Sequence, residues 1–369
     1  MACQFQSVGS TAPFLADSFG TNFARLGTLI GLYMLPGIFM SVPGGMLGQR
    51  FGAKNLMLAG LCLMALGGMM MGASTSFLFI AAGRLTSGVG AVLINVLAAK
   101  MVADWFAGRE IVTAMAILVV SWPLGLALGL LLFAPLAASH SWNAVMYATA
   151  LLALISLLLV ALIYRNPPAT TEPSALDLKL ALTRHEWLGV SFAGATWMAY
   201  NVGLIILISF LPGLFTVRGY SLPEAGSIVS LLGWVLIVST PLAGALAERQ
   251  RRPNLYLVGG LLIAGLAAAA LPFVHATIIA FGIIAAAIGA PAGPIMALPE
   301  QALLPENRGS GMGVYFTWYY AGMAVLPGLA GLFRDMTANP AAPALFASGM
   351  MALAIITLAG CRLVNRPLV

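Results

Sequence analysis

Charged side chains are scarce in this sequence. Only 8% of its 369 residues are Asp, Glu, Lys or Arg, whereas 61% are apolar. A soluble domain carries about 25% charged residues, so this chain lacks the polar surface that a water-soluble protein of its size needs. The scarcity excludes most soluble enzymes, secreted disulfide scaffolds, disordered chains and nucleic-acid binders. It predicts a protein whose main partner is the lipid bilayer.

Cysteine and histidine are also rare. The three cysteines are an odd number and form no C-x-x-C pair, so no disulfide framework is predicted. The three histidines fall in expected loops, and none of the eleven acidic residues lies in the middle of a long apolar run. We therefore expect no metal site, no cofactor and no membrane enzyme. The N-terminus also lacks the basic segment of a cleaved signal peptide.

Long apolar runs are abundant instead. A helix needs about 20 residues to cross the hydrocarbon core of a bilayer. Eleven runs meet this need, and a shorter one covers residues 2–17. The full runs are 25–48, 54–73, 77–99, 111–134, 143–164, 188–214, 223–246, 254–273, 276–298, 311–333 and 341–363. The sequence predicts an all-α membrane protein with twelve transmembrane helices, the first shortened at its N-terminus.

One connection differs from the short loops elsewhere. Residues 165–187 are rich in proline and charge, which is typical of a linker. We expect an N-terminal six-helix bundle at 1–164, a cytoplasmic linker at 165–187 and a C-terminal six-helix bundle at 188–369. With the N-terminus inside, thirteen of the seventeen Lys and Arg residues lie on the cytoplasmic side. This bias predicts a cell membrane protein (inner or plasma membrane) with both termini in the cytoplasm.

The two halves repeat each other at a fixed shift of 199 positions. The shift pairs Arg50 with Arg249 and Arg109 with Arg308, in matching loops. Such a repeat is typical of secondary transporters. It places the counterpart of Leu188 before Met1, so we expect the chain to begin inside its first helix, through truncation or a misplaced start.

A motif lies between the second and third apolar runs, Gly45-Met46-Leu47-Gly48-Gln49-Arg50-Phe51-Gly52-Ala53-Lys54. It resembles the G-x-L-x-D-R-x-G-R-K signature of the major facilitator superfamily, and 244–249 forms a similar second copy. The resemblance extends over nearly the whole chain. It implies two bundles that rock about a central site and expose it alternately to each side. The implied gating residues are Gly45, Gln49, Arg50, Gly52, Lys54, Gly244, Glu248 and Arg249.

The first copy of the motif departs from the family at one position. Gln49 stands where the family has a carboxylate that helps to latch one conformation, while Glu248 keeps the charge in the second copy. A hydrogen bond from a neutral amide is weaker than a charge-assisted one. The latch in the first half is therefore in doubt.

Arg84 lies within the run 77–99, in a stretch that resembles the family's R-x-x-x-G-x-G pattern. An arginine inside a membrane span costs about 2.5–3.5 kcal/mol on insertion scales and usually faces protein or a water-filled cavity. We expect Arg84 to bind an anionic group or to steady a hydrogen-bond network; snorkelling toward the interface is the alternative. Gly88 and Gly90 are expected to serve helix packing.

Polar and aromatic residues in the middle of a span are unfavourable against lipid, so they are candidates for a substrate site. For any single aromatic residue, packing in the core is the competing interpretation. The candidates are Gln4, Gln6, Arg84, Asn95, Trp122, Trp197, Tyr200, Asn201, Tyr315, Trp318 and Tyr319.

These observations predict a monomeric secondary transporter that moves a small solute by rocker-switch alternating access. Arg84 favours a small anion. Because no carboxylate lies mid-span to relay protons, we expect transport that is uncoupled or driven by the charge of the substrate; titration of Asp17 is the alternative. Residues 100–110 look similar to the inner loop of cyanate and nitrate/nitrite permeases. The main alternative function is proton-coupled multidrug or metabolite efflux.

Overall fold

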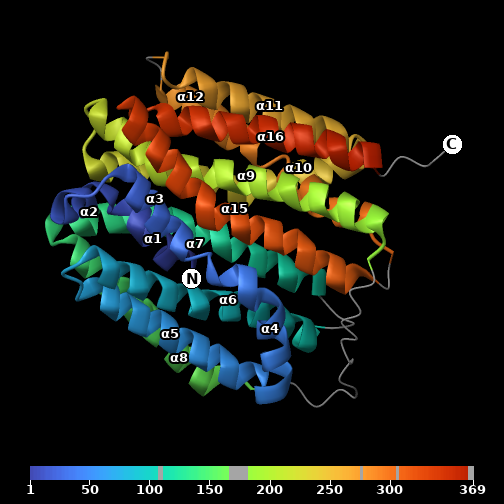
Figure 1. Ribbon diagram of the computed structural model, residues 1–369, viewed down its shortest axis with the longest axis horizontal. Coiled ribbons are helices and arrows are strands. Elements are labelled where there is room, and N and C mark those ends of the chain that lie inside the picture. The colour runs from blue at the N-terminus through green and yellow to red at the C-terminus, as the bar shows by residue number, and fades with distance from the viewer. Residues whose placement is uncertain (107–110, 166–181, 275–276, 305–306, 365–369) are drawn as a thin grey trace. The chain divides into compact units, whose positions relative to one another are not determined.

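The computed structural model describes residues 1–106, 111–165, 182–274, 277–304 and 307–364 (Figure 1). All regular elements in these ranges are helices, which confirms the predicted all-α class. Their bounds are α1 Ala2–Ser10, α2 Ala12–Phe19, α3 Phe23–Leu32, α4 Pro36–Phe51, α5 Ala53–Gly72, α6 Phe77–Phe106, α7 Ile111–Ser139, α8 Trp142–Ile163, α9 Arg184–Val217, α10 Leu222–Arg249, α11 Pro253–Ala270, α12 Thr277–Ile288, α13 Ala292–Met296, α14 Leu298–Ala302, α15 Arg308–Thr337 and α16 Ala342–Val364.

Ten helical segments in the described residues are long and apolar enough to cross a membrane. They correspond to ten of the eleven full runs predicted from the sequence. The eleventh run lies in α15, which has 30 residues but is not among the ten. Its length suffices, but polar aromatic residues such as Trp318 and Tyr319 lower its mean hydropathy.

The helix bounds follow the predicted repeat. The helices α3, α5, α6, α7 and α8 correspond to α10, α11, α12, α15 and α16. Each helix of the second set begins within two residues of the position given by the 199-residue shift; α3, for example, starts at Phe23 and α10 at Leu222. The repeat found in the sequence is therefore also a repeat of helix boundaries.

Several predicted runs are interrupted in the structure. The partial run 2–17 forms two helices, α1 and α2, that meet at Thr11. The run 276–298, predicted as one helix, ends its first part at Ile288 and continues as the short helix α13 after Pro291. Proline removes a backbone donor and clashes with the preceding turn, so these breaks follow from the positions of Pro13 and Pro291.

The chain forms two compact units. The first contains Met1–Thr21 and Leu29–Asp177, and the second contains Asn22–Thr28 and Leu178–Val369. The boundary between the units therefore falls inside α3 as well as in the connection after α8. Most of the predicted linker 165–187 lies outside the described residues, and its role as a domain boundary stays a prediction.

Glycines set the packing of α5 in the first unit. The helix lies between α6 and α8 (Figure 1). A Cβ added to Gly60 would lie 3.0 Å from the carbonyl oxygen of Gly90, and one added to Gly83 would lie 2.9 Å from that of Gly67. The backbones of α5 and α6 therefore touch, as small residues allow in membrane helices. The packing role predicted for Gly90 is confirmed.

Helix α9 is the centre of the second unit. It packs against α15 and α16 (Figure 1). Helix α11 packs on the other side of α16. Within its apolar window 89% of the residues are buried, compared with 22% for α8 in the first unit. Side chains on α9 therefore face neighbouring helices on almost every side, whereas α8 exposes leucines as a helix against lipid would.

The contact between α5 and α6 leads to a test of packing. Gly67→Ala is expected to destabilise the protein by about 1–3 kcal/mol, because the added methyl group must displace the backbone of α6. The matched control is Gly259→Ala in α11, where an added Cβ meets nothing within 4 Å. Thermal unfolding of the purified protein should show a lower Tm for the first variant only; equal shifts would contradict this packing.

Candidate functional site

Arg84 is completely buried in α6. Its Nε donates to the carbonyl oxygen of Leu29 at 2.9 Å, its Nη1 to that of Gln4 at 2.7 Å and its Nη2 to that of Phe5 at 2.6 Å. The guanidinium carbon also lies 4.5 Å from the ring centre of Tyr33. These bonds connect α6 to α1 and α3. They correspond to the hydrogen-bond network that the sequence analysis gave as one of two roles for Arg84. Snorkelling is wrong, because no part of the side chain is exposed.

The charge of Arg84 is balanced by dipoles in these contacts. The carbonyl of Leu29 is one of the last four of α3, which have no partner within their own helix. Carbonyl dipoles stabilise a buried guanidinium but carry no net charge. The interior of the first unit therefore keeps a positive potential near α1. Three of the five N–H groups of the guanidinium are used in these bonds, and the side chain is completely buried, so direct contact with a substrate would require the surrounding helices to open.

Two buried amides lie on α1. Gln4 donates from Nε2 to the carbonyl oxygen of Met64 at 2.9 Å, and its Oε1 is buried without a partner among the described residues. The amide nitrogen and oxygen of Gln6 are also buried without a hydrogen-bond partner among the described residues. Unsatisfied buried polar atoms are rare, and they commonly mark a site for water or for a polar ligand group. The structure thus keeps Gln4 and Gln6 as candidates.

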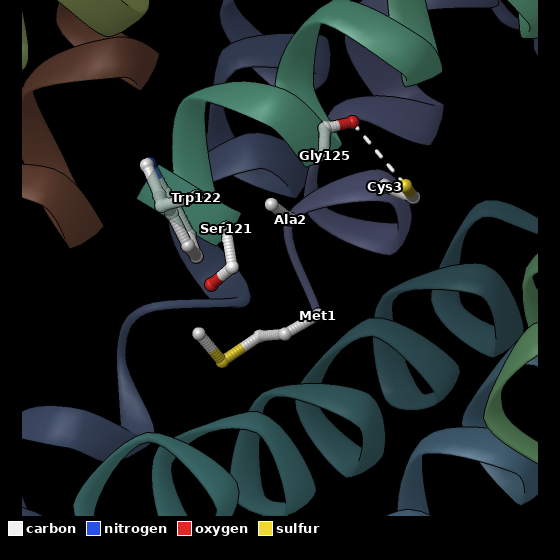
Figure 2. A pocket seen from close by; sticks show the side chains of 6 residues that line it. All are labelled: Met1, Ala2, Cys3, Ser121, Trp122 and Gly125. Carbon is white, nitrogen blue, oxygen red and sulfur yellow. Dashed lines mark hydrogen bonds between the residues drawn. The ribbon is translucent and has the colours of Figure 1, made fainter. Parts of the chain in front are cut away.

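A small hollow lies where α1 begins beside α7 (Figure 2). Its volume is about 180 Å³, and its lining residues are Met1, Ala2, Cys3, Ser121, Trp122 and Gly125. The Trp122 ring centre lies 5.6 Å from that of Phe5, which itself contacts Arg84. The ring of Phe5 therefore links Trp122 to Arg84.

Asn95 lies apart from Arg84 and Trp122. It is exposed on α6, eleven residues beyond Arg84, or about 16 Å along the helix at a rise of 1.5 Å per residue. Of the candidates in the first unit, the structure gathers Gln4, Arg84 and Trp122 and leaves Asn95 apart.

The other six candidates gather in the second unit. Trp197, Tyr200 and Asn201 share one face of α9, and the equally spaced set of Tyr315, Trp318 and Tyr319 shares one face of α15. Trp197 is the centre of the group: its ring lies 5.6 Å from that of Tyr200 and 6.4 Å from those of Tyr315 and Tyr319. We call these four rings the Trp197 cluster.

Glycines bring the two helices close enough for this stacking. A Cβ added to Gly194 would lie 3.0 Å from the carbonyl oxygen of Tyr315, so the backbone of α15 crosses α9 at this position. Gly322 on α15 makes the reciprocal contact with the side chain of Met198. The rings stack one turn away from each crossing point.

Polar atoms fix the orientation of the cluster. The Tyr200 hydroxyl donates to the carbonyl oxygen of Ile288 at 2.8 Å, where α12 ends, and the Tyr315 hydroxyl contacts the Met296 sulfur at 3.6 Å. The Asn201 amide donates to the carbonyl oxygen of Trp197 at 2.8 Å. These bonds hold two tyrosine rings in place.

The cluster has both buried and open parts. Tyr200 and Tyr315 are buried, Trp197 and Tyr319 are partly exposed, and Trp318 is 40% exposed. Rigid aromatic faces that are partly open can stack against a planar apolar group. Chemically, the arrangement can therefore bind a ring but offers no charge of its own.

The predicted gating residues are described only in part. The side chains of Gln49, Arg50 and Glu248 lie outside the described residues, and Gly45 also falls among the undescribed positions of α4. Gly244 has open space around it, and Arg249 is exposed at the end of α10. Their gating role stays a prediction.

Two residues of the first motif have clear structural roles. Gly52 adopts φ +83°, a left-handed conformation that glycine tolerates best, between α4 and α5. The Lys54 ammonium donates to the carbonyl oxygens of Ala161 at 3.0 Å and Tyr164 at 2.7 Å. Lysine at a helix C-terminus satisfies its last carbonyls. Lys54 therefore ties the start of α5 to the end of α8.

Glu186 is a polar junction that the sequence analysis did not select. Its carboxylate accepts hydrogen bonds from the Leu304 amide at 3.0 Å and from the Asn307 side chain at 2.9 Å. It also accepts from the backbone and hydroxyl of Thr183, each at 3.0 Å. The T-x-x-E spacing of a capping box was the available signal. The contact holds the beginning of α9 against the connection between α14 and α15.

The Arg84 contacts lead to a second test. Arg84→Met is expected to destabilise the protein by about 3 kcal/mol, because it removes three buried charge-assisted bonds. Arg84→Lys should fall between this variant and the parent, since an ammonium cannot reach all three carbonyls at once. Arg249→Met, at an exposed position, is the control. Unchanged thermal unfolding of Arg84→Met would contradict the network role.

Comparison with known proteins identifies the family to which the chain belongs. The family model described as Major Facilitator Superfamily matches residues 1–327 of the chain. The chain is similar to the 3-(3-hydroxy-phenyl)propionate transporter of Escherichia coli (strain K12), with 27% identity over 267 residues. This match covers 69% of the chain and 63% of the relative.

Other relatives carry different names. The hexuronate transporter of Bacillus subtilis (strain 168) is 22% identical, over 61% of the chain and 56% of the relative. The chain thus spans less than two thirds of the length of these two relatives. The multidrug efflux protein YfmO of the same organism is 24% identical, over 90% of the chain and 83% of the relative. Such mixed names do not support the predicted cyanate or nitrate branch.

Solved structures share the fold. The crystal structure of a D-xylose–proton symporter matches with a TM-score of 0.78 and 14% identity, over 98% of this chain and 93% of that chain. At this identity the likeness concerns the arrangement of helices alone.

Proposed function

Because the chain belongs to the major facilitator superfamily, we propose that it is a secondary transporter of small solutes rather than an enzyme and that its solute is a small organic anion with a planar ring. The solute moves by alternating access, through a rocker switch of the two six-helix bundles. The observation that carries this proposal is the partly open Trp197 cluster in the second unit.

The ring of the solute stacks on the Trp197 cluster. Trp197 and Tyr319 are partly exposed while Tyr200 and Tyr315 are held by hydrogen bonds behind them. An aromatic pair contributes about 0.5–1.5 kcal/mol beyond the area that it buries. Rings that are already fixed lose little conformational entropy when a ligand binds. A planar group is therefore favoured over a flexible chain.

The negative charge of the solute is favoured by Arg84. This guanidinium sits in the first unit with carbonyl dipoles and aromatic rings around it, so its net charge remains. In a medium of low dielectric constant such a charge favours an anion over a neutral or cationic solute within the first unit. Arg84 then acts through its electrostatic field while it holds α1 and α3 in place.

The names of two relatives agree with this substrate class. A phenylpropionate and a hexuronate are both carboxylates, and the first also contains an aromatic ring. We do not extend the proposal to cyanate or nitrate. We place the protein in the inner or plasma membrane with both termini in the cytoplasm, as the distribution of Lys and Arg favours, and as a monomer.

Proton-coupled efflux of drugs or metabolites is the alternative function. The match to YfmO over most of both chains favours it, and Asp17, exposed on α2, is the carboxylate that would titrate. This alternative predicts binding of lipophilic cations, whereas our proposal predicts binding of ring carboxylates.

A ligand series tests the substrate class. Benzoate is expected to raise the Tm of the purified protein, benzamide to raise it less because it is neutral, and tetraphenylphosphonium to have no effect. Trp197→Ala should weaken the apparent affinity for benzoate about tenfold, the loss of roughly 1.4 kcal/mol of stacking. The control is Trp187→Ala, at a half-exposed position in the first turn of the same helix.

Variants of Arg84 test the charge separately. Arg84→Met should reduce the preference for benzoate over benzamide, and Arg84→Lys should keep it, since only the second variant retains the charge. Equal responses to benzoate and tetraphenylphosphonium would rule out the anion proposal and favour multidrug efflux.

Proteoliposome uptake tests the coupling. We expect benzoate uptake to follow its own electrochemical gradient and to change less than about twofold when a pH gradient is imposed at fixed membrane potential, because no carboxylate lies mid-span to relay protons. A strong dependence on the pH gradient that disappears in Asp17→Asn would contradict uncoupled transport and favour titration at Asp17.

A further inference from the structure

The turn between α10 and α11 carries a group of exposed arginines. Arg249, Arg251 and Arg252 are exposed, and their guanidinium groups make no hydrogen bond or ion pair with the described part of the chain. Arg362, in the last turn of α16, reaches the start of α11, where its Nη2 donates to Oδ1 of Asn254 at 2.5 Å. We call these four arginines the arginine surface. All of it belongs to the second unit.

Arg251 adopts a backbone conformation that suits glycine. Its φ is +52°, in the left-handed region where a residue with a Cβ atom is disfavoured. The 199-residue shift pairs it with Gly52, which has φ +83° in the corresponding turn between α4 and α5. The second half of the chain therefore carries an arginine where a glycine would be less strained. Strain of this kind is retained where the side chain has a use of its own.

The arginine surface lies at the edge of the lipid. The apolar segments on either side of the turn end at Ala247 and begin at Pro253, and the segment in α16 ends at Val364. Helices that cross the hydrocarbon core leave such a turn in the headgroup layer. Leu255 in the first turn of α11 and Leu363 in the last turn of α16 are 58% and 63% exposed. Cations next to exposed apolar side chains match a phospholipid better than a soluble anion.

We propose that the arginine surface binds the phosphate of an anionic phospholipid, whose acyl chains lie against the exposed leucines. A guanidinium pairs with two phosphate oxygens at once. Helix α11 also begins without a side-chain cap, so its free amides and its dipole favour an anion at the same place. A zwitterionic lipid carries its own cation beside the phosphate and therefore gains less from a cluster of arginines.

A lipid titration of the purified protein in detergent tests this binding. Phosphatidylglycerol is expected to raise the Tm, whereas phosphatidylcholine at the same mole fraction should change it little. Arg252→Gln should weaken the apparent affinity for phosphatidylglycerol about fivefold, and Arg251→Gln added to it should bring the loss to about thirtyfold, because each charge near an anionic surface contributes about a factor of five. Arg249 stays unchanged, since it is one of the predicted gating residues.

The matched control is Arg165→Gln, which removes one exposed arginine after α8. It should change the affinity for phosphatidylglycerol less than about twofold. A loss as large as that in Arg252→Gln would overturn the proposal, because the lipid would then respond to the net charge of the protein and not to this surface.

Arg251→Gly separates the charge from the backbone. This variant removes the guanidinium and supplies the residue that a left-handed turn favours. Without added lipid its Tm should equal or exceed that of the parent, while its affinity for phosphatidylglycerol should fall about fivefold. An unchanged affinity would overturn the proposal, and a lower Tm in the same variant would assign Arg251 to the stability of the turn instead.

Glycerol 3-phosphate distinguishes a lipid from a free phosphate. It carries the phosphate group without acyl chains, so it should not raise the Tm at concentrations at which phosphatidylglycerol saturates the protein. An equal rise would overturn the lipid as the ligand and favour a soluble phosphate compound. Salt at 1 M should weaken the binding of phosphatidylglycerol, since exposed charges are screened; binding that is insensitive to both salt and the arginine variants would also contradict the proposal.

Discussion

Backbone groups at the ends of a helix have no water to bond with inside a bilayer, and this constraint accounts for many of the polar contacts in the chain. Arg84 donates a hydrogen bond to a carbonyl near the end of α3, and Lys54 donates to those at the end of α8. Tyr200 donates to the last carbonyl of α12. Asp335 serves free amides at the start of α3 in the same way. These four side chains therefore supply the hydrogen bonds that helix ends and breaks cannot make for themselves.

This use of polar groups limits how they can recognise a solute. The Arg84 guanidinium is completely buried among its three carbonyl partners, and the Tyr200 hydroxyl already donates to the carbonyl oxygen at the end of α12. What remains available for contact is the open face of rings such as Trp197. This is why the proposed substrate class rests on the shape of the ring surface and on charge and not on direct hydrogen bonds.

Much of the architecture could be predicted from the sequence. Apolar run lengths located the spans because bilayer thickness fixes the length that a helix needs, and the pairing of Arg50 with Arg249 set the repeat that the helix bounds later followed. The mid-span positions of Trp197 and Tyr315 also made both residues candidates for a site. These features depend on periodicity, which is written in the chain.

The rest depends on contacts between distant residues. Nothing near Arg84 in the sequence identifies its partners, because Gln4, Phe5 and Leu29 offer only backbone carbonyls, which every residue has. The break at Pro291 was visible as a proline but not as a place that Tyr200 would close. Asp335 was passed over because it lies at a helix end, where a carboxylate is ordinarily a solvated group.

Helix α9 is 34 residues long, or about 51 Å at helical rise, whereas the hydrocarbon core of a bilayer is only about 30 Å thick. It must therefore tilt strongly or project well beyond the lipid tails. Because Glu186 lies in its first turn, a projection on that side places the carboxylate and its partners among headgroups and water, where ionisation carries little cost. The helix that carries Trp197 would then reach the aqueous surface at its first turn. The proline of α9, Pro212, lies beyond the rings, so a tilt that moved the first turn by a few ångströms would displace Trp197 and Tyr200 with it.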